Sequence, residues 1–242
     1  MDCLVTGASR GIGRAIALRL AEEGGQILVN YLRNEAAALD VCAEIAERGG
    51  HGIAVQGDVR NPKALKALVQ AAEDAFGGLD VLVHNAAIGA LAPMHKIRVS
   101  HWDLTLESSL RPFWLLSKLA RPILRPGGCI VGLSSLGSRR FTPGYAAMGA
   151  AKAGMEALTR QLAVELAPDI RVNTVCGGLV ATDALQAFPD GEAMAAEVAS
   201  ITPMGSLTEP EHLADAVEFL CSSRSRWITG QVIVVDGGFS CL

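Results

Sequence analysis

Short apolar runs alternate with amphipathic stretches along this chain, and no other feature restricts its fold as strongly. The apolar runs at 4–5, 27–31 and 52–56 are each followed by an amphipathic stretch, at 15–23, 36–48 and 62–76. This alternation predicts βαβ units and a parallel sheet. Four further runs, at 81–84, 129–133, 171–175 and 231–235, bring the expected strands to seven. We expect an α/β fold: a single Rossmann-like, doubly wound domain over residues 1–242, with a seven-stranded parallel sheet and helices on both faces.

Length and charge limit the classes of function. The chain has 242 residues, half of them hydrophobic, which is enough for one large core. Its net charge is −4 and its charged residues are scattered, so we expect no partnership with nucleic acid or with a membrane surface. The N-terminal residues lack the basic start and apolar run of a signal peptide, and no apolar stretch approaches the roughly 18 residues of a membrane helix. These features predict a cytoplasmic protein that acts on small molecules.

The cysteines give no sign of a metal site. They are widely spaced, at positions 3, 42, 129, 176, 221 and 241. They form no CxxC pair, and none of the five histidines lies at metal-ligand spacing beside them. We therefore expect free, mostly buried thiols and no bound metal.

A glycine-rich turn, Thr6 to Gly13, joins the first expected strand to the first expected helix. Glycines at 7, 11 and 13 permit a tight turn and a close approach of the backbone to a pyrophosphate. The pyrophosphate would then lie at a helix N-terminus, where free N–H groups and the helix dipole favour negative charge. The strand–turn–helix context makes this a nucleotide-binding turn rather than a merely structural one.

The identity of the nucleotide depends on the residue that meets the adenosine ribose after the second strand. NAD enzymes usually place Asp or Glu there to bind the 2′-hydroxyl, but residues 27–34 contain no acid before Glu35. Arg33, after that strand, and Arg10, in the glycine turn, carry guanidinium groups suited to a 2′-phosphate. Either arginine alone is also compatible with a solvated surface position. The two together predict NADPH.

A segment near the middle of the chain indicates the chemistry. Residues 134–152 resemble the active-site segment of the short-chain dehydrogenase/reductases, with Ser135, Tyr145 and Lys152 as its chemical groups. Most members of that superfamily carry Tyr-x3-Lys, whereas the residue four before Lys152 is Met148, which has no acidic proton. Tyr-x6-Lys is the mark of the superfamily's enoyl-thioester reductases. The resemblance therefore implies reduction of a carbon–carbon double bond, with Tyr145 placed by Pro143-Gly144 at a loop–helix junction.

The resemblance extends from Leu4 to about Gly238. It includes the T-G-x-x-x-G-x-G turn, Gly57-Asp58-Val59, the degenerate His84-Asn85-Ala86-Ala87, the segment 172–182 and the closing strand and turn at 228–238. It implies the following cofactor-binding residues: Gly7, Ser9, Arg10, Gly11, Ile12, Gly13, Arg33, Asp58, Val59, Asn85, Ala86, Lys152, Gly178, Val180 and Thr182. For Asn85, a structural role that stabilises the central strands is an equal alternative to contact with the ligand.

The same resemblance implies roles for the catalytic candidates. Tyr145 would donate to the thioester oxygen as negative charge develops there. Lys152 would bind the nicotinamide ribose and lower the tyrosine pKa. Ser135 would bind substrate and could donate a second hydrogen bond. Ser109 stands where the family has a proton-relay asparagine, so it either holds a bridging water or the relay is absent.

These motifs are most similar to the third bacterial type of enoyl-acyl-carrier-protein reductase, which is NADPH-dependent and usually tetrameric. The resemblance implies a homotetramer acting on an acyl thioester linked to acyl carrier protein or coenzyme A, in fatty acid or polyketide biosynthesis. The stretch 184–206, with Leu185, Phe188 and Met204, is the expected substrate lid, and Leu179 lies just before it. Two alternatives remain open: a 3-oxoacyl or other carbonyl reductase, and a catalytically silent NADP-binding subunit.

Overall fold

The computed structural model describes residues 1–22, 24–89, 91–182, 185 and 190–242. The described residues form one seven-stranded parallel sheet in the order β3-β2-β1-β4-β5-β6-β7. The strands are β1 (Asp2–Val5), β2 (Gln26–Tyr31), β3 (His51–Gln56), β4 (Leu79–His84), β5 (Leu124–Ser135), β6 (Ile170–Gly177) and β7 (Val232–Val235). The predicted seven-stranded parallel sheet is confirmed. The order of the strands reverses between β1 and β4, and ligands bind beside such a reversal in open α/β sheets.

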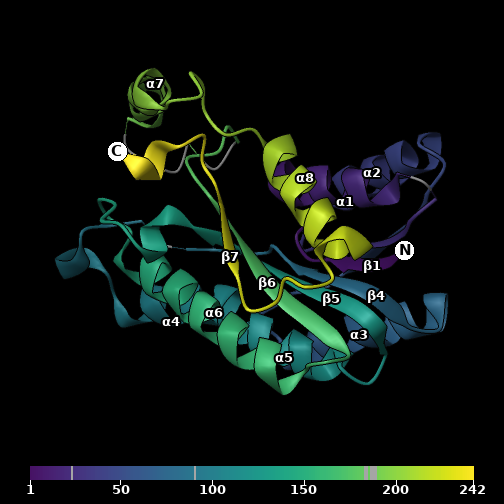
Figure 1. Ribbon diagram of the computed structural model, residues 1–242. Coiled ribbons are helices and arrows are strands. Elements are labelled where there is room, and N and C mark those ends of the chain that lie inside the picture. Colours follow the sequence, from purple (N-terminus) through teal and green to yellow (C-terminus); the bar gives the residue numbers. More distant parts are fainter. Residues whose placement is uncertain (23, 90, 183–184, 186–189) are drawn as a thin grey trace.

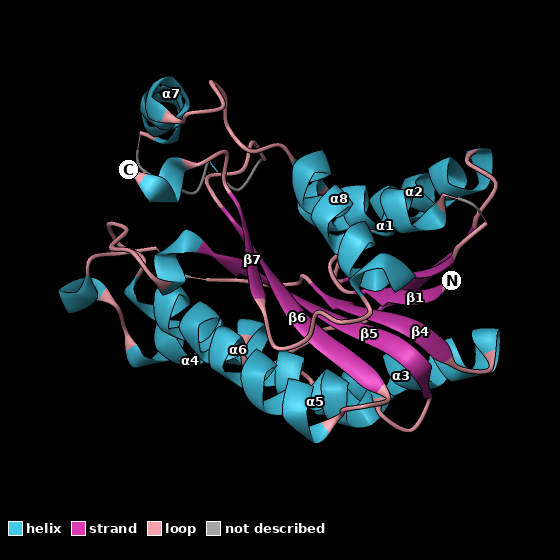
Figure 2. Cartoon of the chain, viewed as in Figure 1, coloured by secondary structure: helices cyan, strands magenta, loops and turns pink. Residues whose placement is uncertain are grey.

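Helices cover both faces of the sheet, as predicted (Figure 1). The α-helices are α1 (Gly11–Ala21), α2 (Glu35–Glu47), α3 (Pro62–Phe76), α4 (Val99–Ser109), α5 (Arg111–Ala120), α6 (Ala146–Glu165), α7 (Gly191–Ile201) and α8 (Pro210–Cys221). Figure 2 shows α1, α2 and α8 on one face and α3, α4, α5 and α6 on the other. Short 3-10 turns include η1 (Met94–Lys96), η2 (Leu136–Ser138) and η5 (Phe239–Cys241).

Two apolar cores result from the alternation of side chains along each buried strand. In β1, Cys3 and Val5 pack with α1, α2 and α8, whereas Leu4 between them packs with α3, α5 and α6. The first core is rich in small residues from α1 and α8, and the second contains Phe113 and Met155. A strand buried on both faces is mostly apolar on both, which explains why the runs were nearly continuous rather than alternating in the sequence.

Helix boundaries follow from local chemistry. The Asn61 side chain accepts a hydrogen bond from Lys63 N at 2.9 Å, Pro62 occupies the first turn, and Gly77 ends α3 with a φ of 68°. These signals explain why the predicted 62–76 helix is confirmed to the residue. α1 instead begins at Gly11, four residues before the predicted start, because the glycines of the turn themselves form its first turn.

The connection between β6 and α8 contains α7, which lies near the C-terminal turn in Figure 1. Met204 N donates to Gly237 O at 3.1 Å, so the end of this connection packs on the C-terminal segment. Phe188 of the expected lid, and Asp183, Ala184 and Pro189 beside it, lie outside the described residues. All six cysteines are free, four of them buried. In the described part of the chain, no helix has the length and apolar character needed to cross a membrane.

Candidate active site

A cavity of about 730 Å³ lies beyond the carboxyl ends of the strands. The segments that follow β1 through β6 all contribute to its wall, as expected for the ligand site of a doubly wound sheet. The predicted site residues that line it are Gly7, Ser9, Arg10, Gly11, Ile12, Asp58, Val59, Asn85, Ala86, Ser135, Tyr145, Lys152, Gly178, Val180 and Thr182. Of the predicted set, Gly13 and Arg33 do not line it.

The glycine turn has the geometry that its sequence predicts. Gly7 has a φ of 64° and Gly11 a φ of 53°, conformations that favour glycine. Gly13 faces the turn instead of the cavity: a β-carbon there would lie 2.3 Å from Gly7 O and 2.5 Å from Asn85 Nδ2. Its role is therefore close packing of α1 against the turn, whereas Gly11 leaves room toward Thr182, whose Cγ2 lies 3.6 Å from a β-carbon built at 11.

Two buried or half-buried asparagines fix this turn to the sheet. Asn30 Oδ1 accepts from Gly7 N at 3.2 Å, and its Nδ2 donates to Val55 O at 3.3 Å and Gly57 O at 3.1 Å. Asn85 Nδ2 donates to Thr6 O at 3.0 Å and to Gly7 O at 3.1 Å. Asn85 thus has the structural role considered above while also lining the cavity. Asn30 was missed, although an amide within an apolar strand was a visible signal.

The N-terminus of α1 fits a phosphate group. The N-cap is Arg10, and within the described residues its side chain makes no cap hydrogen bond to the helix. Arg10 therefore does not cap the first N–H groups of α1, and Arg10 and Gly11 beside them line the cavity. This helix end and the glycine-lined wall fit the pyrophosphate of a dinucleotide.

Asp58, expected to meet the adenine, already has a protein partner. Arg60 donates from Nε at 2.9 Å and from Nη2 at 2.6 Å to the two carboxylate oxygens. This hydrogen bonding is the main reason that the pKa of Asp58 is lowered, and the charge of Arg33 contributes. Arg33 is exposed and stands near Asp58 outside the cavity wall.

Lys152 is a buried cation at the centre of the site. Its Nζ donates to Leu133 O at 2.6 Å, and burial lowers its pKa to about 8. Burial, with the charge of Lys152 as a smaller cause, lowers the pKa of nearby His84 to about 3. His84 is therefore neutral. Because Ser109 O can only accept, His84 donates to it from Nε2 at 2.9 Å, and the Nδ1 that remains accepts from Thr6 Oγ1 at 3.2 Å.

Tyr145 is the N-cap residue of α6, at the predicted loop–helix junction. Its pKa is raised, chiefly by burial, and the hydrogen bond with the Ser135 side chain opposes this effect. The expected lowering by Lys152 is not found. Seven residues correspond to about 10.5 Å of helical rise, and the Lys152 ammonium is engaged with the β5 backbone instead. At neutral pH Tyr145 is a protonated phenol, which is the form that donates a hydrogen bond.

Met148 and Ser109, the two departures from the family pattern, lie in contact. Ser109 Oγ lies 3.8 Å from Met148 Sδ, and both residues are buried. Met148 lines the cavity, and its Cε would lie 2.2 Å from a β-carbon at Gly89. An apolar thioether thus fills the position one helical turn before Lys152. Ser109 does not line the cavity, so its hydroxyl is not at the cavity wall where a relay would meet solvent or ligand.

Part of the cavity wall is apolar and includes Leu136, Leu179, Leu185, Met194 and Val198. Phe239 of the C-terminal turn also lines it, and Arg140 donates from Nη1 to Phe239 O at 3.0 Å. Met204 does not line the cavity. These apolar side chains of the wall suit an apolar substrate.

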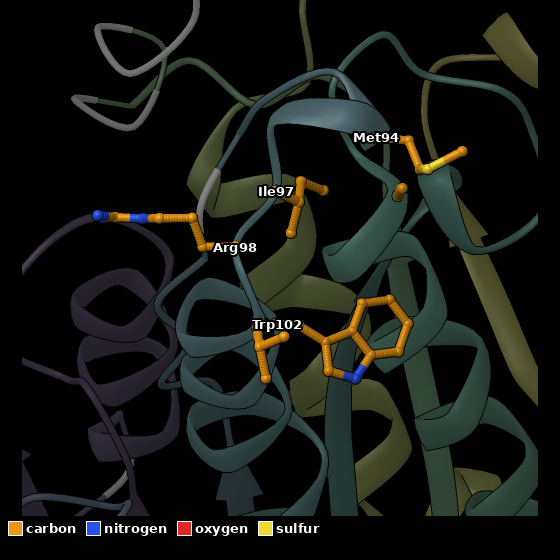
Figure 3. A pocket seen from close by; sticks show the side chains of 6 residues that line it. Met94, Ile97, Arg98 and Trp102 are labelled. Carbon is orange, nitrogen blue, oxygen red and sulfur yellow. The ribbon is translucent and has the colours of Figure 1, made fainter.

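A second, smaller cavity of about 320 Å³ lies outside this site, near the start of α6 (Figure 3). It is lined by Met94, Ile97, Arg98, Val99, Trp102 and Ala146. The Arg98 side chain points away from Met94 and Trp102 in Figure 3. This lining is mainly apolar and contains no acid, base or nucleophile positioned for chemistry.

Known proteins resemble the chain along almost its whole length. A family model described as Enoyl-(Acyl carrier protein) reductase matches residues 7–240. The chain is 42% identical over 240 residues to 1-cyclohexenylcarbonyl-CoA reductase of Streptomyces collinus, covering 98% of this chain and 86% of that protein. It is 37% identical over 240 residues to 3-oxoacyl-[acyl-carrier-protein] reductase FabG of Staphylococcus aureus, covering 98% and 97%. The structure of a short chain dehydrogenase from Burkholderia cenocepacia J2315 in complex with NADP matches with a TM-score of 0.92 and 34% identity, covering 99% and 97%.

Proposed function

The chain belongs to the short-chain dehydrogenase/reductase family of oxidoreductases, and we propose that it reduces the carbon–carbon double bond of an enoyl thioester with NADPH. One observation carries the proposal. The phenol in the cavity belongs to Tyr145 at the start of α6, while the position one turn before Lys152 holds Met148. A methionine cannot donate a proton to a carbonyl oxygen, so the displaced tyrosine is the phenol that α6 offers to a substrate.

The reaction requires one hydride and one proton. When bound, NADPH supplies the hydride, which forms a bond to the β-carbon of the substrate. The double-bond electrons then move onto the thioester oxygen as an enolate, and when the enolate collapses the α-carbon takes a proton from solvent water. Tyr145 holds its proton at neutral pH because burial raises its pKa, and it donates a hydrogen bond to the enolate oxygen. Ser135, whose side chain lowers the Tyr145 pKa from beside the hydroxyl, would orient that donor.

Several residues would hold the cofactor. The N-terminus of α1 and the wall at Gly11 and Thr182 would receive the pyrophosphate. Arg10 and Arg33 would bind a 2′-phosphate, which would displace Arg33 from its exposed position beside Asp58. Lys152 would bind the nicotinamide ribose. The neighbour described in complex with NADP supports this choice of cofactor.

The substrate class is supported by the relatives and by the cavity wall. Proteins named for a cyclohexenylcarbonyl-CoA and for a 3-oxoacyl-carrier-protein both handle acyl thioesters. The apolar side chains in the cavity wall offer an environment for such an acyl group. Reduction of a 3-oxoacyl thioester is the second candidate. It is favoured by Ser135 and Tyr145, which both line the cavity, because two hydroxyl donors suit a carbonyl oxygen.

The test is NADPH oxidation by the pure protein with but-2-enoyl-CoA and, separately, with 3-oxobutanoyl-CoA. We expect turnover of the enoyl substrate that falls about 10² to 10⁴-fold in Tyr145→Phe. Tyr31→Phe is the matched control, because Tyr31 is the only other tyrosine and does not line the cavity. Turnover of the 3-oxo substrate alone would show that the protein is a ketoreductase and not an enoyl reductase. NADPH binding without turnover of either would identify a silent subunit.

A further inference from the structure

Glu156 is a buried carboxylate on α6 to which the proposed reaction assigns no role. Its side chain is 8% exposed. Tyr145, Gly149, Lys152 and Glu156 are spaced by four, three and four residues, which places them along one face of the helix. Glu156 therefore extends the line of residues that contains both the proposed acid and the buried cation. Buried carboxylates are costly unless they are fully hydrogen-bonded, so the contacts of Glu156 require an explanation.

The side chains that hydrogen-bond to Glu156 come from the end of β5 and the turn that follows it. Ser134 Oγ donates to Oε1 at 2.8 Å, and Ser138 Oγ donates to the same oxygen at 2.6 Å. Arg139 Nε donates to Oε2 at 2.9 Å. We call these four residues, Glu156, Ser134, Ser138 and Arg139, the Glu156 clamp. The clamp fastens both ends of the 134–139 segment to α6.

The residues between the two ends of the clamp contact Tyr145. The Ser135 side chain lies close enough to the Tyr145 phenol to lower its pKa. A β-carbon built at Gly137 would lie 2.3 Å from Tyr145 Cδ1, so the ring lies directly against the Gly137 backbone. A β-carbon built at Gly149 would lie 2.5 Å from Gly137 O, so the same backbone also presses on α6. A shift of this segment would therefore move both the hydrogen-bond partner and the packing surface of the phenol.

We propose that Glu156 is a positioning residue, whose carboxylate holds Ser135 and Gly137 where they orient the Tyr145 phenol. The proposal rests on the function proposed above only in taking Tyr145 as the group to be oriented. Glu156 lies three turns from Tyr145 and does not line the cavity, so it acts through the clamp and not on substrate. Displacement of a reacting group by about 1 Å lowers rates by about 10²-fold, which sets the size of the expected effect.

The first measurement is an ultraviolet titration of the phenol. In a Tyr31→Phe background Tyr145 is the sole tyrosine, so its ionisation is read directly. Because the Ser135 hydrogen bond lowers the Tyr145 pKa, loosening the clamp in Glu156→Ala should move the titration to higher pH. Glu156→Gln retains an acceptor for the two serines and should shift it less. Glu165→Gln, an exposed glutamate on the same helix, is the control and should leave it unchanged.

The second measurement is turnover and NADPH binding in the same variants. We expect kcat to fall about 10 to 100-fold in Glu156→Ala and less in Glu156→Gln, with the Kd for NADPH changed less than about twofold. If Glu156→Ala fails to fold, Glu156→Gln and Ser138→Ala provide the test. A lowered Tm with an unchanged phenol titration and unchanged kcat would make the clamp purely structural and overturn the proposal. The titration needs no substrate, so it tests the clamp even if the proposed reaction is wrong.

Discussion

The Tyr145 ring lies on the backbone of Gly137, where a β-carbon would be 2.3 Å from Cδ1 of the ring. Residue 137 must therefore lack a side chain for the tyrosine to keep this orientation. The contact links a turn after β5 to the residue that caps α6, two segments that the chain brings together only in the folded state. It makes the position of the phenol sensitive to a single methyl group.

We predict that Gly137→Ala lowers kcat on the enoyl substrate by about 10²-fold, because the added methyl group must displace the ring. The Kd for NADPH should hardly change, since Gly137 is not among the residues expected to hold the cofactor. Gly137→Ala should also lower the Tm, because the methyl group and the ring cannot both keep their positions. In a Tyr145→Ala background the same substitution should no longer lower the Tm, and this comparison is a double-mutant cycle for the contact. Full turnover in Gly137→Ala would contradict this packing.

Met148 provides a test of reaction specificity. A phenol at this position stands about 6 Å of helical rise before Lys152, against about 10.5 Å for Tyr145. We expect Met148→Tyr to raise the ratio of 3-oxo to enoyl turnover at least about tenfold, measured as kcat/KM on the two CoA thioesters. Met148→Phe carries the same ring without the acidic proton and serves as the control. An equal ratio in both variants would show that bulk, and not the proton, causes the effect.

Cofactor preference depends on Arg33. Charge reversal in Arg33→Glu should raise the KM for NADPH at least about tenfold while changing the KM for NADH little, because only NADPH carries the 2′-phosphate. Arg48→Glu makes the same charge change at the other end of α2, where Arg48 pairs with Glu22. A rise in both Michaelis constants after Arg33→Glu, or an equal rise after Arg48→Glu, would show that Arg33 does not contact the 2′-phosphate.

His84 should make the fold sensitive to acid. Burial lowers its pKa from 6.5 to about 3, so between these pH values the unfolded chain binds a proton that the folded protein does not. The stability contributed by neutral His84 is present above pH 6.5 and is lost as the pH falls toward 3. The free energy of unfolding, measured by urea titration of the cofactor-free protein at several pH values, should fall less steeply in His84→Asn. An identical slope in the variant would show that other groups dominate.

Lys152 should make the stability of the fold depend on pH in the alkaline range. Its pKa falls from 10.5 to about 8 on folding, so the unfolded chain binds more protons between these values and stability rises with pH across them. The burial penalty below pH 8 is about 3 kcal/mol, at about 1.4 kcal/mol for each tenfold change in proton affinity. Lys152→Met should remove this rise in the cofactor-free protein. Measuring the difference between wild type and variant cancels the titration of the cysteines and tyrosines.

The fold could be predicted because local chemistry decides it. Continuous apolar runs mark strands covered on both faces, and the Asn61, Pro62 and Gly77 signals fix α3. The backbone geometry of the glycine turn was also predictable, since the turn is continuous in sequence. Gly13 shows the limit of sequence reasoning. Its lack of a side chain allows close packing against Gly7 and Asn85, and only the tertiary contact distinguishes this role from contact with a ligand.

The surroundings of Tyr145 and Lys152 were less predictable, because the contacts there join separate segments of the chain. The pair of Ser109 and Met148 is separated by 39 residues, and their contact has no sequence signature. The spacing of Tyr145, Gly149, Lys152 and Glu156 did contain a signal, a polar stripe on one helix face, and Glu156 could have been found from it. The effect of Lys152 on the Tyr145 pKa was expected by analogy, but burial, Ser135 and Cys176 are the groups that shift that pKa.

The amides of Asn30 and Asn85 form their hydrogen bonds to the protein backbone. The glycine turn and the ends of three strands are thus held in place before any nucleotide arrives. Binding then requires little loss of conformational entropy at this end of the cavity, and affinity depends mainly on the hydrogen bonds and ion pairs that the nucleotide forms. An Asn30→Ala enzyme would retain every group expected to contact the nucleotide, yet it would bind more weakly, with a less favourable entropy in calorimetry.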